Sequence, residues 1–159
     1  MKVTLLAVGS LKEDYFRRAA EEYVSRLTPY AEVKIHEIAE YKTTPSSSAA
    51  NVAQARDKEG AAIIKAIPAG SVPVALAIEA TPQSSVQFAA FLGQLRDSGQ
   101  GHVCFIIGGS NGLSDAVKKA SADKLSFGPL TLPHQLARIV LLEQIYRAFK
   151  IMRNEPYHK

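Results

Sequence analysis

The sequence has little of what several classes of protein need. Its 159 residues include one cysteine, Cys104, so no internal disulfide forms, and the surrounding apolar run HVCFIIG favours a small buried side chain over a nucleophile. No apolar stretch approaches the roughly 20 residues of a membrane span, and the opening MKVTLLAVGS is too short an apolar run for a secretory signal. We therefore expect a cytoplasmic protein with no membrane partner, built as a single domain over residues 1–159.

Motifs for metal and phosphate chemistry are also missing. The four histidines are scattered, without HExxH or paired cysteines, so no metal is expected. The glycines of FIIGGSNG follow the spacing GGxxG. This is neither the dinucleotide-binding pattern GxGxxG nor a Walker A loop, so phosphate chemistry of the usual kinds has no support.

The charge is unevenly placed along the chain. A formal net charge of +4 slightly favours an anionic partner, and from residue 134 onward five basic residues accompany two acidic ones. Tyr157 adds a ring that stacks on bases, and His158 adds a group that titrates near neutral pH. Arg147, Lys150 and Asn154 recur at spacings of three and four, which suits phosphate contacts from one helix face. A frayed basic tail explains the same composition, and composition leaves both explanations open.

Short apolar runs alternate with segments of helical period. Strands are expected over Lys2–Val8, 33–38, 72–78 and 102–108. The last two are continuously apolar, as central strands of a parallel sheet are. Helices are expected after a capping box formed by Ser10 and Glu13, and over 51–67, Ser85–Asp97 and 135–152. The alternation predicts an α/β fold with a mainly parallel sheet.

Two loops stand out from this pattern. The glycine turn 108–112 follows a strand end, where ligands bind in open α/β sheets, although glycines serve equally well in a tight turn. The run LSFGPLTLPHQ combines prolines with apolar residues and must be an ordered loop. Its backbone groups and apolar walls suit a flat ligand such as adenine. The plainer alternative is that Pro133 and His134 only begin the last helix.

Three stretches together form a specific pattern: FIIGGSNG, then LSFGPLTLPHQLARIVLLEQIYRAFKI, then the terminal PYHK. With the start MKVTLLAVGSLKEDYF, they closely resemble the small bacterial methyltransferases of the SPOUT class that modify N3 of a pseudouridine in large-subunit ribosomal RNA. The resemblance runs the full length of the chain. It implies a SPOUT-type α/β knot whose C-terminal segment threads a loop. Knotted chains are rare, so a knot would not be expected from the alternation of strands and helices alone. The resemblance also implies a homodimer that acts on 23S rRNA within the assembled ribosome.

The same resemblance implies a cofactor and its binding residues. The methyl donor is S-adenosyl-L-methionine, held by the loops of the knot without a metal. Carried onto matching positions, the cofactor contacts are Leu76, Gly108, Phe127, Gly128, Pro129, Leu130, Thr131 and Leu132. Family members often have serine and leucine in place of Phe127 and Gly128. Because such loops contact the ligand largely through the backbone, we expect cofactor binding to tolerate this departure.

The chemistry implied by the resemblance needs an ionised nucleophile. N3 of a uracil-like ring is a weakly acidic imide that must lose its proton before it attacks the methyl carbon. We expect His158 to act as the base, Arg147 to stabilise the anion or hold a phosphate, and Tyr157 to stack on or orient the nucleotide. Ionisation without a protein base is the alternative.

Two other functions remain open from the residues themselves. A non-catalytic RNA-binding module of the ribosome would keep the basic tail but would not need the glycine and proline loops. A flavodoxin-like nucleotide receptor would need ligand groups after the first strand, where this chain has only GSLKED.

Overall fold

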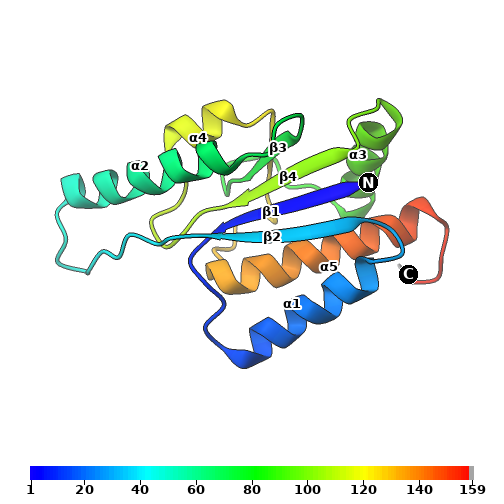
Figure 1. Ribbon diagram of the computed structural model, residues 1–159, viewed down its shortest axis with the longest axis horizontal. Helices are drawn as coiled ribbons and strands as arrows, with labels where there is room; N and C mark the ends of the chain where they lie inside the picture. The colour runs from blue at the N-terminus through cyan, green and yellow to red at the C-terminus, as the bar shows by residue number, and fades with distance from the viewer. Residues whose placement is uncertain (158–159) are drawn as a thin grey trace.

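The computed structural model describes residues 1–157, in which strands and helices alternate along the chain (Figure 1). The elements are β1 (Lys2–Val8), α1 (Asp14–Leu27), β2 (Glu32–Ile38), α2 (Ala49–Ala66), β3 (Val72–Leu76), α3 (Ser85–Asp97), β4 (His102–Ile107), α4 (Asp115–Ala120), β5 (Asp123–Leu125) and α5 (His134–Met152). Within the described range the strands form one sheet of order β2-β1-β4-β3-β5, and every pair is parallel. The predicted α/β class is confirmed, and the knot itself stays a prediction.

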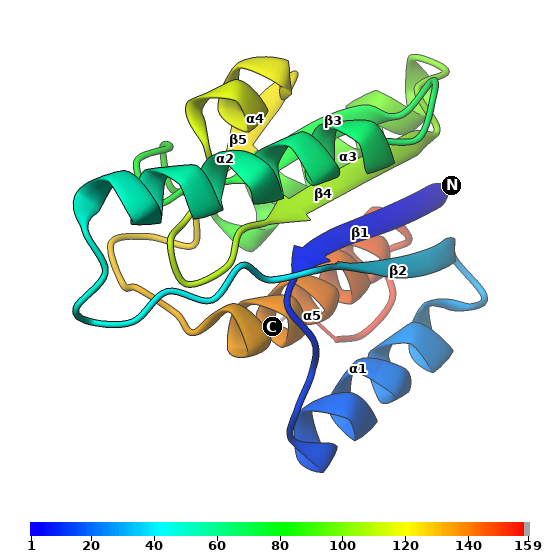
Figure 2. The ribbon, with the colours of Figure 1, turned by 60° about the vertical axis from the view of Figure 1, so that its left-hand side comes forward.

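The sheet is covered on both faces, which explains its apolar strands. Helices α1, α3 and α5 pack on one face and α2 and α4 on the other (Figures 1 and 2). Side chains of β1 therefore alternate between two cores: Leu5 joins the α1, α3 and α5 side, and Leu6 joins the α2 and α4 side. Cys104 of β4 is fully buried in the second core, and burial raises the pKa of its thiol to about 12. It is a packing residue, as predicted.

The capping box predicted before α1 is wrong. The helix begins at Asp14, and within residues 1–157 its N-cap residue makes no side-chain capping hydrogen bond. The preceding backbone bonds elsewhere, because the N–H groups of Leu11 and Lys12 donate to side chains of β2 and α5 at 3.1 and 2.9 Å. A capping box forms instead at α3, between Ser84 and Gln87.

Arg138, on α5, is a fully buried charged side chain that joins three elements. Its Nη1 donates to Glu37 Oε1 of β2 at 2.9 Å. Its Nη2 donates to the carbonyl of Val8 at 3.0 Å and to that of Gly9, where β1 ends. These bonds fix the start of α5, which borders the cavity described below, against the carboxyl ends of β1 and β2.

We expect Arg138→Met to lower the free energy of unfolding by about 2 kcal/mol. Methionine keeps an apolar stem of similar length but leaves two buried carbonyls unpaired. Urea unfolding at fixed protein concentration measures the change. The matched control is Arg18→Met on α1, whose side chain is 72% exposed and should cost less than about 0.5 kcal/mol. Equal stability of the two variants would contradict this account of Arg138.

Candidate active site

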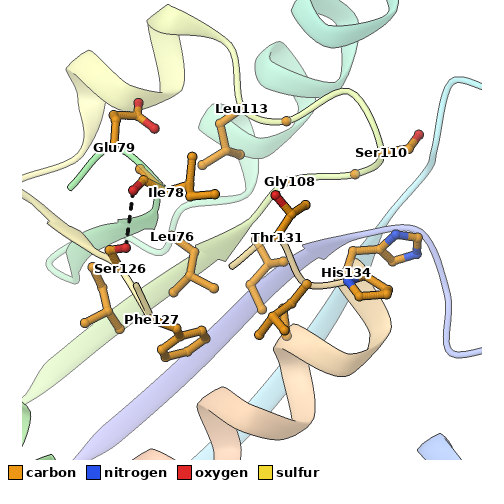
Figure 3. Close-up of a pocket in the computed structure, with 18 of the residues that line it drawn as sticks. Leu76, Ile78, Glu79, Gly108, Ser110, Leu113, Ser126, Phe127, Thr131 and His134 are labelled. Atoms are coloured by element: carbon orange, nitrogen blue, oxygen red, sulfur yellow. Dashed lines mark hydrogen bonds between the residues drawn. The ribbon is translucent and has the colours of Figure 1, made fainter. Parts of the chain in front are cut away.

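A cavity of about 730 Å³ lies at the carboxyl ends of β3 and β4 (Figure 3). Its walls come from the end of β3, the glycine turn after β4, the loop after β5 and the start of α5, with Arg56 of α2 and Lys118 of α4. Seven of the eight residues predicted to contact the cofactor line it: Leu76, Gly108, Phe127, Gly128, Leu130, Thr131 and Leu132. Pro129 lies in the same loop but is not among the lining residues. Both unusual loops of the sequence therefore border a single cavity.

The glycine turn can be built only from glycine at its first position. A Cβ on Gly108 would lie 2.8 Å from the carbonyl carbon of Gly112 and 2.9 Å from its oxygen. Gly112 itself has a φ of +73°, and its N–H donates to the carbonyl of Gly109 at 3.0 Å. The glycines thus serve the tight turn and also bring backbone close to the cavity.

The loop after β5 is ordered by Ser126, which is buried. Its Oγ accepts the N–H of Gly128 at 3.1 Å and lies 3.4 Å from the carbonyl of Ile78, the contact drawn in Figure 3. Gly128 has a φ of +105°, a backbone conformation that residues other than glycine rarely adopt. Glycine at position 128 therefore has a structural reason. Phe127 packs partly buried against the main core.

Charged groups at the cavity are mostly neutralised. Lys118 Nζ lies 2.5 Å from Glu79 Oε1, and this hydrogen bond lowers the pKa of the Glu79 carboxyl. Burial, and then the charge of Arg138, lowers the pKa of His134, so that its imidazole is neutral near pH 7. His134 begins α5 and also lines the cavity. The segment at Pro133 and His134 therefore begins the last helix and also borders a ligand-sized cavity, so both interpretations of it hold.

The glycine turn also contains a serine, Ser110, at the GxSxG spacing of one class of hydrolases, GGSNG. Its Oγ donates to Glu40 Oε1 at 3.3 Å. Among residues 1–157 this partner is a carboxylate and not a histidine, so the serine–histidine pair of that class of hydrolases is not formed there.

The described part of the C-terminal tail folds back onto α5. Tyr157 Oη donates to Glu143 Oε1 at 3.2 Å, and Arg147 donates to the same oxygen from Nε at 3.0 Å and Nη2 at 2.6 Å. The guanidinium of Arg147 lies 4.8 Å from the ring centroid of Tyr157. Burial, and then the charge of Glu143, raises the pKa of Tyr157 to about 12. Tyr157 therefore stays protonated near neutral pH and is unsuited to act as a base.

The prediction that Arg147, Lys150 and Asn154 share a helix face is wrong for Asn154. Helix α5 ends at Met152, and Asn154 has a φ of +52°, which turns the chain. Lys150 Nζ lies 2.5 Å from Glu155, which also accepts the hydroxyl of Tyr30 at 2.6 Å. The tail is thus held against the fold as far as Tyr157, and the alternative of a frayed tail does not apply to these residues. The proposed base, His158, lies outside the described residues.

The cavity and the C-terminal cluster lie at opposite ends of α5. His134 lines the cavity at the first residue of the helix, and Arg147 follows in its last two turns. A helix rises 1.5 Å per residue, which places about 20 Å between them along the axis. One copy of the chain therefore does not bring Arg147 and Tyr157 to its own cavity.

Residues 1–157 contain neither a metal-binding cluster nor a membrane-spanning helix. No cluster of three or more histidine, cysteine, aspartate or glutamate side chains has the geometry to hold a metal ion. None of the helices in this range combines the length and hydrophobicity of a membrane span.

Comparison with known proteins identifies the family. Residues 1–158 match the family model described as predicted SPOUT methyltransferase. Proteins named ribosomal RNA large subunit methyltransferase H are 50% identical in Listeria monocytogenes serovar 1/2a and 45% identical in Bacillus thuringiensis, and both alignments cover 100% of each chain.

Solved structures share the fold at low sequence identity. A Legionella pneumophila structure, described as a methyltransferase with bound cofactor SAM, is 14% identical with a TM-score of 0.50, over 93% of this chain and 66% of its own. A Neisseria gonorrhoeae structure, described as a methylase family protein, is 13% identical with a TM-score of 0.56, over 99% and 85%. The fold, the full-length family match and the close relatives agree, and the chain belongs to the SPOUT methyltransferase family.

Proposed function

We propose that this chain transfers the methyl group of S-adenosyl-L-methionine to N3 of a pseudouridine in 23S rRNA. The observation that carries the proposal is the full-length identity of 45 to 50% to proteins named ribosomal RNA large subunit methyltransferase H. The cavity at the ends of β3 and β4 gives this activity a place on the fold. Such a substrate locates the protein in the cytoplasm, at the ribosome.

The cavity suits the proposed cofactor in size and lining. Its volume falls within the range of about 300 to 1,000 Å³ that small-molecule sites occupy. Leu76, Phe127 and Leu132 offer apolar walls to an adenine ring, and the loop 127–132 offers backbone donors and acceptors. The cofactor supplies an activated methyl group, so the transfer needs no metal. This volume and lining support the assignment of the predicted residues to cofactor binding.

We further propose that the active enzyme is a homodimer in which one copy completes the cavity of the other. The separation of about 20 Å along α5 supports this, because Arg147 and Tyr157 need a second cavity to act on. Exposed apolar side chains beside the cavity are a further reason: Leu130 is 77% exposed and Ile78 is 53% exposed. Apolar exposure of this kind is typical of surfaces that a partner covers.

Within that composite site the tail residues take separate roles. Arg147 is held by Glu143 through two hydrogen bonds, so its positive charge is fixed in place to stabilise an imide anion or a phosphate. Tyr157 remains protonated and orients the nucleotide through its ring and hydroxyl. His158 then remains the candidate base, as the sequence predicts.

Mixing two inactive variants tests the composite site. One copy carries Gly108→Val and the other lacks residues 157–159, and each is expected to be inactive as a homodimer. Random mixing gives half heterodimers, each with one intact site of two, so about a quarter of wild-type activity should return. Heterodimers seen by native mass spectrometry without any recovered activity would contradict a site shared between copies.

Methyl transfer from labelled S-adenosyl-L-methionine tests the activity itself. Purified protein is incubated with free 23S rRNA, large subunits or whole ribosomes, and the label is located by nuclease digestion. We expect label at N3 of a pseudouridine when assembled ribosomes are supplied. Binding to ribosomes without transfer to any of the three substrates would favour the non-catalytic RNA-binding module instead.

A further inference from the structure

Three buried polar atoms without hydrogen-bond partners belong to residues of α2 and of the glycine turn. They are Arg56 Nε, Glu59 Oε2 and Asn111 Nδ2, and within residues 1–157 only two other such side-chain atoms occur. Arg56 and Glu59 are one turn apart on α2, and a Cβ at Gly109 would lie 3.6 Å from Glu59 Oε2. Buried polar atoms are nearly always paired, so a cluster of unpaired ones calls for a physical explanation.

Two of these atoms are donors on residues that line the cavity, Arg56 and Asn111. Asn111 Oδ1 accepts a hydrogen bond from the hydroxyl of Thr43 at 3.2 Å, so the oxygen of this amide already has a partner. Its Nδ2 is the side left without an acceptor. The cavity thus contains a guanidinium and an amide whose donors lack partners in the described chain.

Glu59 is not paired with Arg56 in residues 1–157. Glu59 Oε1 accepts the N–H of Tyr41 at 2.8 Å, and Oε2 has no partner, although Glu59 lies one turn from Arg56 on the same helix. Burial raises the pKa of the Glu59 carboxyl, which weakens it as a charged partner. The other basic residue of the cavity, Lys118, is already paired with Glu79.

An anion with two acceptor oxygens matches a guanidinium and an amide, because both are donors and one carries positive charge. The proposed cofactor has one such group, the α-carboxylate of its methionyl part. We propose that Arg56 and Asn111 form a carboxylate subsite that binds this group, an inference that rests on the proposed function. Holding the far end of the methionyl chain restricts how the sulfur and its methyl group are oriented. Arg56 is therefore a cofactor-binding residue that helps to position the methyl group.

Two ligands, one with and one without the amino-acid part that carries the carboxylate, distinguish binding at the subsite from binding in the rest of the cavity. S-adenosylhomocysteine carries the carboxylate, and 5′-methylthioadenosine has the same adenosine and sulfur without the amino acid. We expect Arg56→Met to weaken binding of S-adenosylhomocysteine by about 10-fold to 100-fold. Binding of 5′-methylthioadenosine should change by less than about twofold. Isothermal titration calorimetry measures both, without any need for RNA or turnover.

Control variants keep the result interpretable. Lys65→Met removes a positive charge from an exposed position of the same helix, outside the cavity, and should leave both affinities unchanged. Arg56→Lys keeps a charge without the planar donor pair and should lose less affinity than Arg56→Met. Asn111→Ala should show the same ligand pattern with a smaller loss, of about fivefold.

The outcomes distinguish the subsite from the proposed function. If Arg56→Met lost affinity for both ligands equally, or lost no affinity for S-adenosylhomocysteine, the carboxylate subsite would be overturned. The cofactor assignment would stay in place. If the wild-type protein bound neither ligand, the proposed function and the subsite would both be overturned. Circular dichroism of each variant confirms that the fold is retained before binding is compared.

Discussion

Removal of residues 157–159 is expected to lower the kcat of methyl transfer by at least about 100-fold while leaving the affinity for S-adenosyl-L-methionine within about twofold. The tail carries the proposed base, His158, and Tyr157, whose ring lies against Arg147. Within one copy Arg147 lies about 20 Å along α5 from His134 at the cavity, so loss of the tail should not disturb cofactor binding. Single-turnover kinetics and calorimetry measure the two quantities.

A control variant tests whether tail charge alone explains such a loss. Arg153→Met removes a basic residue whose guanidinium lies 4.6 Å from the ring centroid of Tyr30. It should keep most of the activity. If the truncated protein retained wild-type kcat, the tail would have no catalytic part.

Single substitutions then assign the roles within the tail. His158→Ala should lower kcat, rather than chiefly raise KM, if the residue acts only in the transition state. Tyr157→Phe keeps the ring and loses only the 3.2 Å bond to Glu143, so it should have a much smaller effect. If His158→Ala kept wild-type kcat from about pH 6 to 9, the imide would ionise without a protein base.

Gly108→Val is expected to weaken S-adenosyl-L-methionine binding by more than about 100-fold. The new Cβ would lie within 3 Å of the backbone of Gly112, so the turn would have to move, and the valine methyl groups would occupy space beside the cavity. The matched control is Gly101→Val, because a Cβ there meets no atom within 4 Å. Unchanged binding by Gly108→Val would show that the cofactor lies elsewhere.

The central part of the fold could be predicted because its signals are local. Strand β3 and, after His102, strand β4 are continuous apolar runs, and burial on both faces produces that pattern. Strand β5 (Asp123–Leu125) was not predicted, because it has three residues, two of them charged, and exists through pairing with β3. The capping box before α1 failed for a related reason: tertiary hydrogen bonds to Glu37 and Gln135 take the local backbone donors.

Some residues of the candidate site could also be predicted from the sequence, and others could not. The resemblance placed the loop 127–132 and Gly108 in one pocket, and the cavity brings them together. Arg56 was missed because it lies more than 50 positions before the glycine turn, in an ordinary helical pattern. The turn at Asn154 was also missed, since it depends on the contacts of Glu155 with Lys150 and Tyr30, which no helical spacing reveals.

Mass mapping of ribosomal RNA from cells that lack this protein tests the central claim most directly. Nuclease fragments of 23S rRNA are compared with those from wild-type cells and from cells that carry the gene again. The proposed function predicts that one fragment containing pseudouridine loses the mass of a methyl group, about 14 Da, and regains it when the gene is restored. Complementation with Gly108→Val should leave that fragment unmethylated. An identical set of fragment masses with and without the protein would contradict the claim that it methylates 23S rRNA.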